Sequence, residues 1–340
     1  MKLRKGRACA ALAIAVLVGV GVFHGCSSDE VGEISFTDSE SSEQEATAET
    51  TAEPTTEPVA EDKTIHIVAA GDNLVQTAVY REAQSHSEDG TSYNFLPLYE
   101  NVRSIIESGD ISILNQETLI CNGEYEISGS NLNFNSPTEL GDDMIDLGFN
   151  VFTMANNHVL DKGTGGLEAT LDYWDTRCEL NDIVVCGAYR NEADMANIRT
   201  MTVDGVTFAF LAYTEHMNGY SIPSYSELRV VLTSETDVIQ SQIQEAKEIA
   251  DVVIVAAHWG VEDVHTVSED RVLLAQDMVE WGADVIIGTH THTAETMEYI
   301  TRSDGTQGFV FYSLGNFISA QADNFNLVGE IADFDVVIDG

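Results

Sequence analysis

Short apolar runs alternate along the chain with stretches whose apolar residues recur at helical spacing. The runs are rich in β-branched residues, which is typical of strands. The sequence predicts strands at residues 64–70, 111–114, 151–154, 183–185, 208–212, 252–256, 285–287, 309–312 and 336–338. It predicts helices at residues 95–107, 137–147, 166–176, 235–250 and 268–281. Because helices separate strands that are apolar almost throughout, the pattern indicates an α/β sandwich with buried central strands.

The N-terminal part lacks this pattern. Residues 1–7 carry four basic residues and no acid, and an uncharged, mostly apolar run of 16 residues follows at 8–23. This order is typical of a secretory signal, and the run is short for a bilayer span, which needs about 20 residues. The sequence therefore predicts a signal peptide at residues 1–25.

The apolar run ends in Gly25-Cys26, which resembles a bacterial lipoprotein signal whose cysteine is lipidated after cleavage. Two alternatives stay open: an ordinary signal peptide with an unmodified Cys26, or an uncleaved anchor. Residues 27–62 hold 12 acids and no Lys or Arg. Such a segment buries too little apolar surface to offset its ordering entropy. We therefore predict a lipidated Cys26 with a disordered acidic tether at residues 26–62, and a single domain at residues 63–340.

The net charge of the chain narrows the classes of function that it can have. The 340 residues include 57 acids and 15 bases, for a formal net charge of −42. This excludes a general nucleic-acid binder, because phosphate contacts need clustered Lys and Arg, and it disfavours direct docking on anionic lipid. Five cysteines are too few for a disulfide-built scaffold, whereas a hydrophobic content of 44% suffices for a core.

Polar side chains follow five of the predicted strands. The runs are Gly71-Asp72-Asn73, Asn115-Gln116-Glu117, Asn156-Asn157-His158, His258-Trp259-Gly260 and His290-Thr291-His292. Ligands of open α/β sheets bind outside the carboxyl ends of strands, so these residues are predicted to share one site. Carboxylate, amide and imidazole groups together suit Zn, Mn or Fe, and a carboxylate can bridge two such ions.

Each run by itself also has a structural interpretation. Gly71-Asp72 is compatible with a simple turn, and a lone His258 on a buried strand with a hydrogen-bonded core residue. In an extended segment His290 and His292 point the same way, whereas in a loop they can serve two metals. The other histidines, His66, His86, His216 and His265, are predicted to be structural or solvated.

The series of motifs resembles one family. Ala70-Gly71-Asp72-Asn73-Leu74, Asn115-Gln116-Glu117-Thr118, Ala155-Asn156-Asn157-His158, His258-Trp259-Gly260-Val261-Glu262, His290-x-His292 and Tyr312-Ser313-Leu314-Gly315-Asn316-Phe317 look, in this order, like the CapA family of capsule-synthesis and poly-γ-glutamate biosynthesis proteins. The resemblance implies a four-layer α/β/β/α sandwich similar to calcineurin-like metallophosphoesterases.

The resemblance also implies roles for individual residues. Asp72 and His292 would hold one divalent metal ion, Asn157, His258 and His290 a second, and Glu117 would bridge them. His158 would sit beside the substrate as proton donor or oxyanion contact, with Asp161 orienting it and with Asn115 and Asn156 supporting the ligands. Leu74 stands where metallophosphatases usually have a histidine ligand.

We therefore expect an exported, lipid-anchored protein of the cell membrane's outer face that acts in capsule or poly-γ-glutamate synthesis, export or anchoring. Its expected cofactor is one or two Mn, Fe or Zn ions in a hydrolase-like site. Its expected partners are an anionic capsule polymer or the machinery that synthesises it, and the membrane through the lipid. A secreted metal-dependent phosphoesterase and a non-catalytic polymer- or partner-binding module are the alternatives.

Overall fold

A computed structural model describes residues 62–130 and 133–338. The predicted signal peptide, the predicted lipidation site Cys26 and nearly all of the predicted tether lie outside these residues. None of the helices within them is both long enough and apolar enough to cross a membrane.

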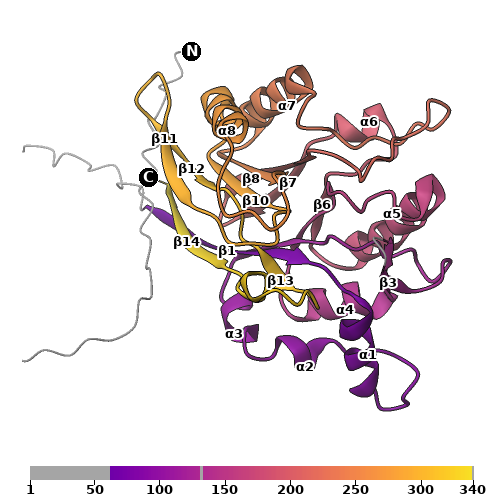
Figure 1. The fold of residues 1–340 in the computed structure, drawn as a ribbon. Coiled ribbons are helices and arrows are strands. Elements are labelled where there is room, and N and C mark those ends of the chain that lie inside the picture. The colour runs from indigo at the N-terminus through magenta and orange to yellow at the C-terminus, as the bar shows by residue number, and fades with distance from the viewer. Residues whose placement is uncertain (1–61, 131–132, 339–340) are drawn as a thin grey trace, which may run out of the picture.

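Two six-stranded sheets form the centre of the fold (Figure 1). The first has the order β13-β1-β2-β5-β6, and β14 pairs antiparallel with β1. Its strands are β1 (Lys63–Asn73), β2 (Ile111–Asn115), β5 (Val151–Thr153), β6 (Val184–Cys186), β13 (Asn316–Ile318) and β14 (Ile331–Ile338). The second has the order β11-β12-β10-β9-β8-β7, with β7 (Arg199–Val203), β8 (Val206–Thr214), β9 (Val252–His258), β10 (Val285–Thr289), β11 (Met297–Thr301) and β12 (Gln307–Phe311).

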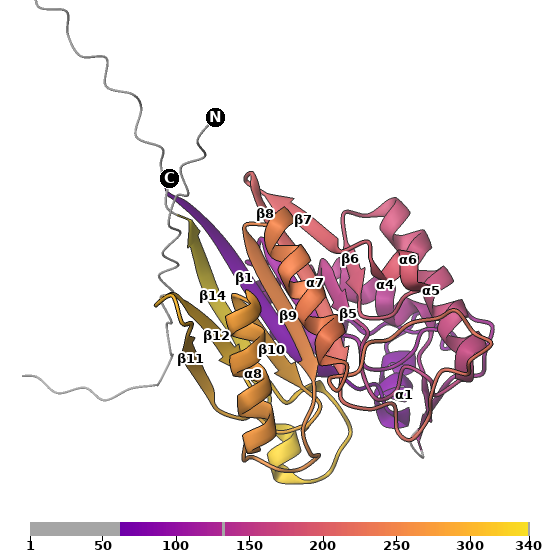
Figure 2. The ribbon, with the colours of Figure 1, turned by 90° about the horizontal axis from the view of Figure 1, so that it is seen from above.

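Side-chain alternation along β8 shows how the layers stack. Phe208 and Phe210 pack in a core cluster that also contains residues of β1, between the two sheets. Ala209 and Leu211 point the other way, into a cluster with residues of α7 (Thr236–Ile249) and α8 (Glu269–Trp281). Figure 2 shows these two helices lying over the second sheet.

Helices on the far side of the first sheet complete the sandwich. The ring centroid of Phe152 in β5 lies 4.5 Å from that of Trp174 in α5 (Gly163–Leu180), and α4 (Thr138–Asp146) packs beside α5. The predicted four-layer α/β/β/α sandwich is therefore confirmed. The smaller elements are α1 (Thr77–Ser85), α2 (Leu96–Tyr99), α3 (Arg103–Ile106), α6 (Glu192–Met195), the hairpin β3 (Ser128–Ser130) and β4 (Asn133–Asn135), and the 3₁₀ turn η1 (Asn324–Leu327).

Strand direction positions the polar residues. β1, β2, β5 and β6 are mutually parallel, as are β8, β9, β10 and β12, so their carboxyl ends gather at one edge of each sheet. The predicted helix at 95–107 is wrong in one respect, because a turn at residues 100–102 divides it into α2 and α3. Asn101 and the β-branched Val102, both weak helix formers, occupy that turn.

Asp143 links two of the outer helices and gives a test of the packing. Its Oδ2 accepts a hydrogen bond from the Phe95 N–H at 2.6 Å, and burial raises the pKa of its carboxyl from 3.8 to about 6. Between these values the folded state binds more protons than the unfolded state, so the group's contribution to stability falls as pH rises from about 4 to about 6. In Asp143→Asn that decline is removed. The melting temperature of the variant minus that of the wild type should therefore rise across this window and level off above it. A difference that does not change with pH would contradict the assignment.

Candidate metal centre

The polar side chains predicted from the strand ends meet at the shared carboxyl edge of the two sheets. Asp72 lies near the end of β1, and His258 is the last residue of β9. The others follow β2, β5 and β10, and each is at most 2% exposed. The structure thus brings together the six predicted ligands and the predicted proton donor: Asp72, Glu117, Asn157, His258, His290, His292 and His158.

The ligand atoms fall into two groups that share Glu117. One contains Asp72, Glu117 and His292, and the other contains Glu117, His258 and His290. Within each group the donor atoms lie within 4.8 Å of one another. This partition matches the one implied by the family resemblance. Leu74 is buried and offers no ligand atom, so three side chains make up the first group.

Glu117 is the residue that most needs a cation. Both of its carboxylate oxygens are buried, and neither has a hydrogen-bond partner among the described residues. Burial, together with the charge of Asp72, raises the pKa of Glu117 well above its ordinary value. Leaving a buried carboxylate unpaired is costly, whereas oxygen donors of this kind are good ligands for divalent ions. The donor set therefore fits a metal.

His258 and His290 are prepared to act as neutral ligands. His258 Nε2 lies 3.1 Å from His290 Nδ1 and 3.0 Å from Asn157 Oδ1, so the three donor atoms converge. Burial and the neighbouring histidines lower the pKa of His258 well below its ordinary value and that of His290 to about 3. Neutral imidazole is the form that binds metal.

The surroundings of His292 shift its pKa in the opposite direction. Burial lowers the pKa of its ring, but the Glu117 carboxylate and a hydrogen bond to Asp72 outweigh burial and raise it to about 10. The His292 Nδ1 lies 3.0 Å from Asp72 Oδ2. A positive charge is therefore favoured beside these two carboxylates, and a metal ion supplies such a charge when it replaces the proton.

The loop after β10 holds both histidines in left-handed backbone conformations, with φ of 96° at His290 and 56° at His292. The interpretation of this stretch as an extended segment is therefore wrong, and the loop alternative holds. Non-glycine residues rarely adopt such angles unless their surroundings impose them. Asp72 accepts a hydrogen bond from the His290 N–H at 3.2 Å to Oδ2, and the Asn326 side-chain amide donates to the His292 carbonyl at 3.1 Å.

Two glycines allow the backbone to close around the centre. A Cβ on Gly71 would lie 1.9 Å from the Gly315 carbonyl oxygen, and one on Gly288 would lie 2.0 Å from the Tyr312 carbonyl oxygen. Only glycine permits these approaches. Because Gly71 precedes Asp72 and Gly288 is two residues before His290, the approaches fix where the ligands emerge from their strands.

His158 lies beside the ligand groups, with its Nε2 4.0 Å from Glu117 Oε1. Its Nδ1 is 2.8 Å from Asp161 Oδ2, which also accepts the Phe134 N–H at 2.8 Å. The Asn156 side chain accepts the His158 N–H and donates to the Gln116 carbonyl, so Asn156 holds the loop instead of facing the ligands. Asn115 donates to Asp72 Oδ1 at 2.7 Å.

Beside the predicted ligands lies His216, which is predicted to be structural or solvated, with its ring centroid 4.9 Å from that of His290. The signal was present: Glu215-His216-Met217-Asn218 follows β8 as the other polar runs follow their strands. The predicted strand ended at residue 212, two residues short of Thr214, so the run was not recognised.

Comparison with known proteins identifies the family. The model of the bacterial capsule synthesis protein family PGA_cap matches residues 66–321. The chain belongs to the PGA_cap family. It is 33% identical over 201 residues to the capsule biosynthesis protein CapA of Bacillus anthracis and 34% identical over 176 residues to the PGA biosynthesis protein CapA of Bacillus subtilis. The resemblance to CapA proteins is therefore confirmed.

These alignments are partial. They cover 58% and 52% of this PGA_cap chain but 46% and 44% of the two relatives, so the chain spans about half the length of the curated relatives it matches. Among solved structures, the NAD nucleotidase of Haemophilus influenzae is 15% identical with a TM-score of 0.49, over 82% of this chain and 48% of that one. A putative 5'-nucleotidase of Staphylococcus aureus is 16% identical with a TM-score of 0.45, over 77% and 57%.

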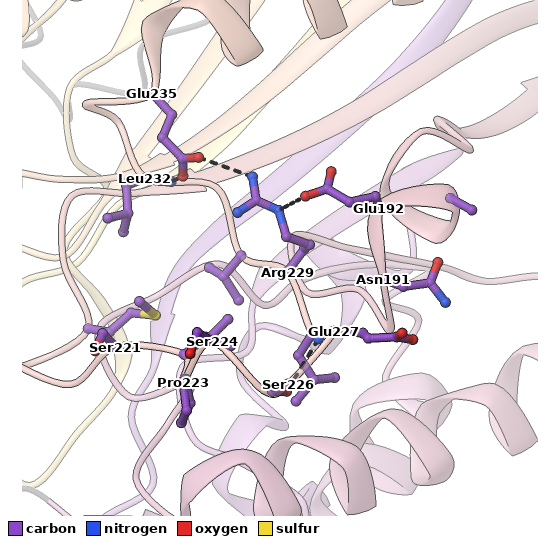
Figure 3. A pocket seen from close by; sticks show the side chains of 15 residues that line it. Asn191, Glu192, Ser221, Pro223, Ser224, Ser226, Glu227, Arg229, Leu232 and Glu235 are labelled. Carbon is purple, nitrogen blue, oxygen red and sulfur yellow. Dashed lines mark hydrogen bonds and ion pairs between the residues drawn. The ribbon is translucent and has the colours of Figure 1, made fainter.

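A cavity of about 800 Å³ in this PGA_cap protein lies away from the ligand side chains (Figure 3). It is lined by residues 191–193 and by the loop between β8 and α7. Arg229 in its wall is paired with Glu192 at 2.9 Å and with Glu235 at 3.0 Å. None of the predicted site residues lines it, but Met217, next to His216, does.

A buried ion pair braces the histidine loop of the PGA_cap centre. Arg271 of α8 donates two hydrogen bonds to Glu295, at 2.7 and 2.8 Å, and Glu295 is fully buried. The guanidinium also packs against Gly260. A Cβ at Gly260 would lie 2.6 Å from the Arg271 guanidinium and 2.8 Å from the Thr291 side chain. The pair therefore joins α8, the end of β9 and the loop that carries His290 and His292.

This brace gives a stability prediction. Arg271→Leu leaves the Glu295 carboxylate buried without its partner, and breaking such a pair costs about 3–5 kcal/mol of unfolding free energy. The double variant Arg271→Leu/Glu295→Leu should lose less, because no charge is stranded. Urea denaturation of the wild type and the two variants measures both effects. A single variant within about 1 kcal/mol of the wild type would show that the pair contributes little.

Proposed function

We propose that this chain is a divalent-metal-dependent hydrolase of capsule or poly-γ-glutamate synthesis, export or anchoring. The observation that carries the proposal is the buried Glu117 carboxylate, which has no hydrogen-bond partner among the described residues and belongs to both ligand groups. The role in capsule synthesis is supported by the family and by the names of the two CapA relatives.

Mn, Fe or Zn would be held by Asp72, Glu117 and His292 on one side and by Glu117, His258, His290 and Asn157 on the other. When bound, such a metal supplies a Lewis acid that activates water and offsets negative charge on the substrate. The carboxylates and neutral imidazoles are already converged and buried, so little rearrangement is needed to bind it.

His158 and Asp161 would carry out the proton transfer of the reaction. Asp161 accepts from the Nδ1–H of His158, which leaves Nε2 as the atom that takes up or releases a proton toward the centre. The edge-on ring of Phe134, 4.6 Å from the His158 ring between centroids, limits the movement of the imidazole. In this arrangement Asp161 orients His158, as a carboxylate does for the general base in other hydrolases.

The acidity of the chain is compatible with an anionic substrate. Residues 63–340 hold 45 acids and 11 bases, so the whole surface repels a polyanion at long range. Screening over about 8 Å in physiological salt limits that repulsion, and a bound divalent ion reverses the local field. We propose that an anionic capsule polymer, or the machinery that makes it, is the partner, outside the cytoplasmic membrane and close to it through a lipid on Cys26.

A phosphoesterase is the second candidate. It is favoured by the His158–Asp161 pair, since an imidazole beside a metal centre is well placed to protonate the leaving alkoxide of a phosphoester. A substrate screen with a phosphoester and a γ-glutamyl peptide separates the two. Binding of metal without cleavage of either class would favour the non-catalytic module instead.

The metal itself is tested through Glu117. Adding Mn²⁺ or Zn²⁺ to chelator-treated wild type should raise its stability, by about 2.7 kcal/mol at a hundred times the dissociation constant. Glu117→Gln removes a ligand from both groups, so the shift should be largely lost and bound metal should fall. Melting temperature and elemental analysis measure this. Asp143→Asn, which removes a half-buried carboxylate hydrogen-bonded to Phe95 instead, is the control and should respond as the wild type does. Equal metal content in Glu117→Gln and the wild type would refute the assignment.

The proton-transfer role is tested through His158. His158→Ala should lower kcat on a cleaved substrate by about 10²- to 10⁴-fold because it removes the proton donor. Asp161→Asn should give a smaller loss, since the imidazole remains but is less well oriented. Metal content should stay at the wild-type level in both. Unchanged kcat in His158→Ala would remove His158 from the mechanism and leave the metal proposal standing.

A further inference from the structure

The loop after β8 reaches the metal centre and is tied to it on both sides of His216. The Glu215 N–H donates to the His258 carbonyl at 2.9 Å, and the Glu215 carboxylate accepts the Gly260 N–H at 2.7 Å. Two residues after His216, Asn218 Oδ1 accepts a hydrogen bond from the Asn157 side chain at 3.3 Å. His216 therefore stands at a defined place beside the ligands.

The hydrogen bonds of His216 fix its tautomer. Its Nδ1 accepts the Asn218 backbone N–H at 3.3 Å, so Nδ1 carries no proton and the neutral ring carries its proton on Nε2. The side chain is half-buried, and among the residues that the structure describes Nε2 has no hydrogen-bond partner. His216 thus offers an N–H donor that has no partner among the described residues, on a ring whose centroid lies 4.9 Å from that of His290.

Such a donor has a clear use at this position. No Arg or Lys in the described part of the chain forms an ion pair with Asp72 or Glu117, and Arg271 is bound to Glu295. None of the described Arg or Lys side chains is therefore paired with the carboxylates that an anionic substrate would approach. Hydrogen-bond donors directed at the substrate's oxygens are one means of recognition that the protein itself can supply.

We propose that His216 is a substrate-contacting residue, whose Nε2–H donates a hydrogen bond to an anionic phosphoryl or carboxyl oxygen of the substrate held at the centre. This rests on the proposed function, because it requires an anionic ligand beside the metal ligands. The contact sits on the face of the centre formed by His290, whose ring meets that of His216 nearly at right angles, at 82°. The same loop continues through Met217 into the wall of the 800 Å³ cavity.

Inorganic phosphate and two substitutions test this on the full chain loaded with Mn²⁺. His216→Phe keeps an aromatic ring against His290 but removes the donor, and should weaken phosphate binding about tenfold or more, as expected for a lost hydrogen bond to a charged group. His216→Gln keeps an N–H at a comparable distance from the backbone and should recover most of the affinity. His86→Ala, at the exposed end of α1, is the matched control and should bind as the wild type does.

The outcomes separate this inference from the proposed function. If the wild type binds no metal, the proposed function fails. If it binds metal and phosphate, and His216→Phe binds phosphate equally well, the inference is overturned and the proposed function stands. Loss of metal from His216→Phe would also overturn it, since His216 would then act on the ligands and not on the substrate. Metal-loaded wild type that does not bind phosphate would overturn the oxyanion contact.

Discussion

The structure depends on one electrostatic problem, which is the burial of two carboxylates, Asp72 and Glu117, at the ends of adjacent strands. Asp72 is surrounded by donors from Asn115, His290 and His292, whereas Glu117 has no hydrogen-bond donor within the part of the chain that the structure describes. The two carboxylates raise the pKa of His292, and burial together with the charge of Asp72 raises that of Glu117, so a positive charge is favoured at the centre. The ligand geometry, the neutral histidines and the strained loop are all arranged around that requirement.

The rigidity of the centre comes from the backbone around it. The approaches at Gly71 and Gly288 bring strand ends of both sheets against the segment that contains Tyr312 and Gly315. The Arg271–Glu295 pair and the hydrogen bond from Asn326 then hold the histidine loop in conformations that an isolated peptide would avoid. Strain concentrated at the ligands and offset by packing elsewhere is typical of a site that must keep its geometry before its ligand arrives.

The sandwich and the candidate ligands can both be predicted from one pattern in the sequence. Continuous apolar runs mark buried parallel strands, and the first polar residues after each run lie at the edge where the strands end. It could not predict the left-handed angles of His290 and His292, because these are imposed by Asp72 and Asn326, which are distant along the chain. His216 escaped notice because the end of β8 was placed two residues early. The exposed edge strand β11 buries only one of its five residues, and the helix α1 is short and mostly polar.

The pairing of β14 with β1 has a consequence for how the centre is presented. Lys63 pairs with Ile338 at the beginning of β1, whereas Asp72 lies nine residues further along the same strand, about 30 Å away at roughly 3.3 Å per residue. Both described ends of the domain therefore emerge together at one pole (Figure 1), away from Asp72 along β1. Whatever is joined to the chain before Lys63 attaches at this pole. If that attachment is to a membrane, as proposed, the candidate ligands lie on the side of the domain away from the point of attachment.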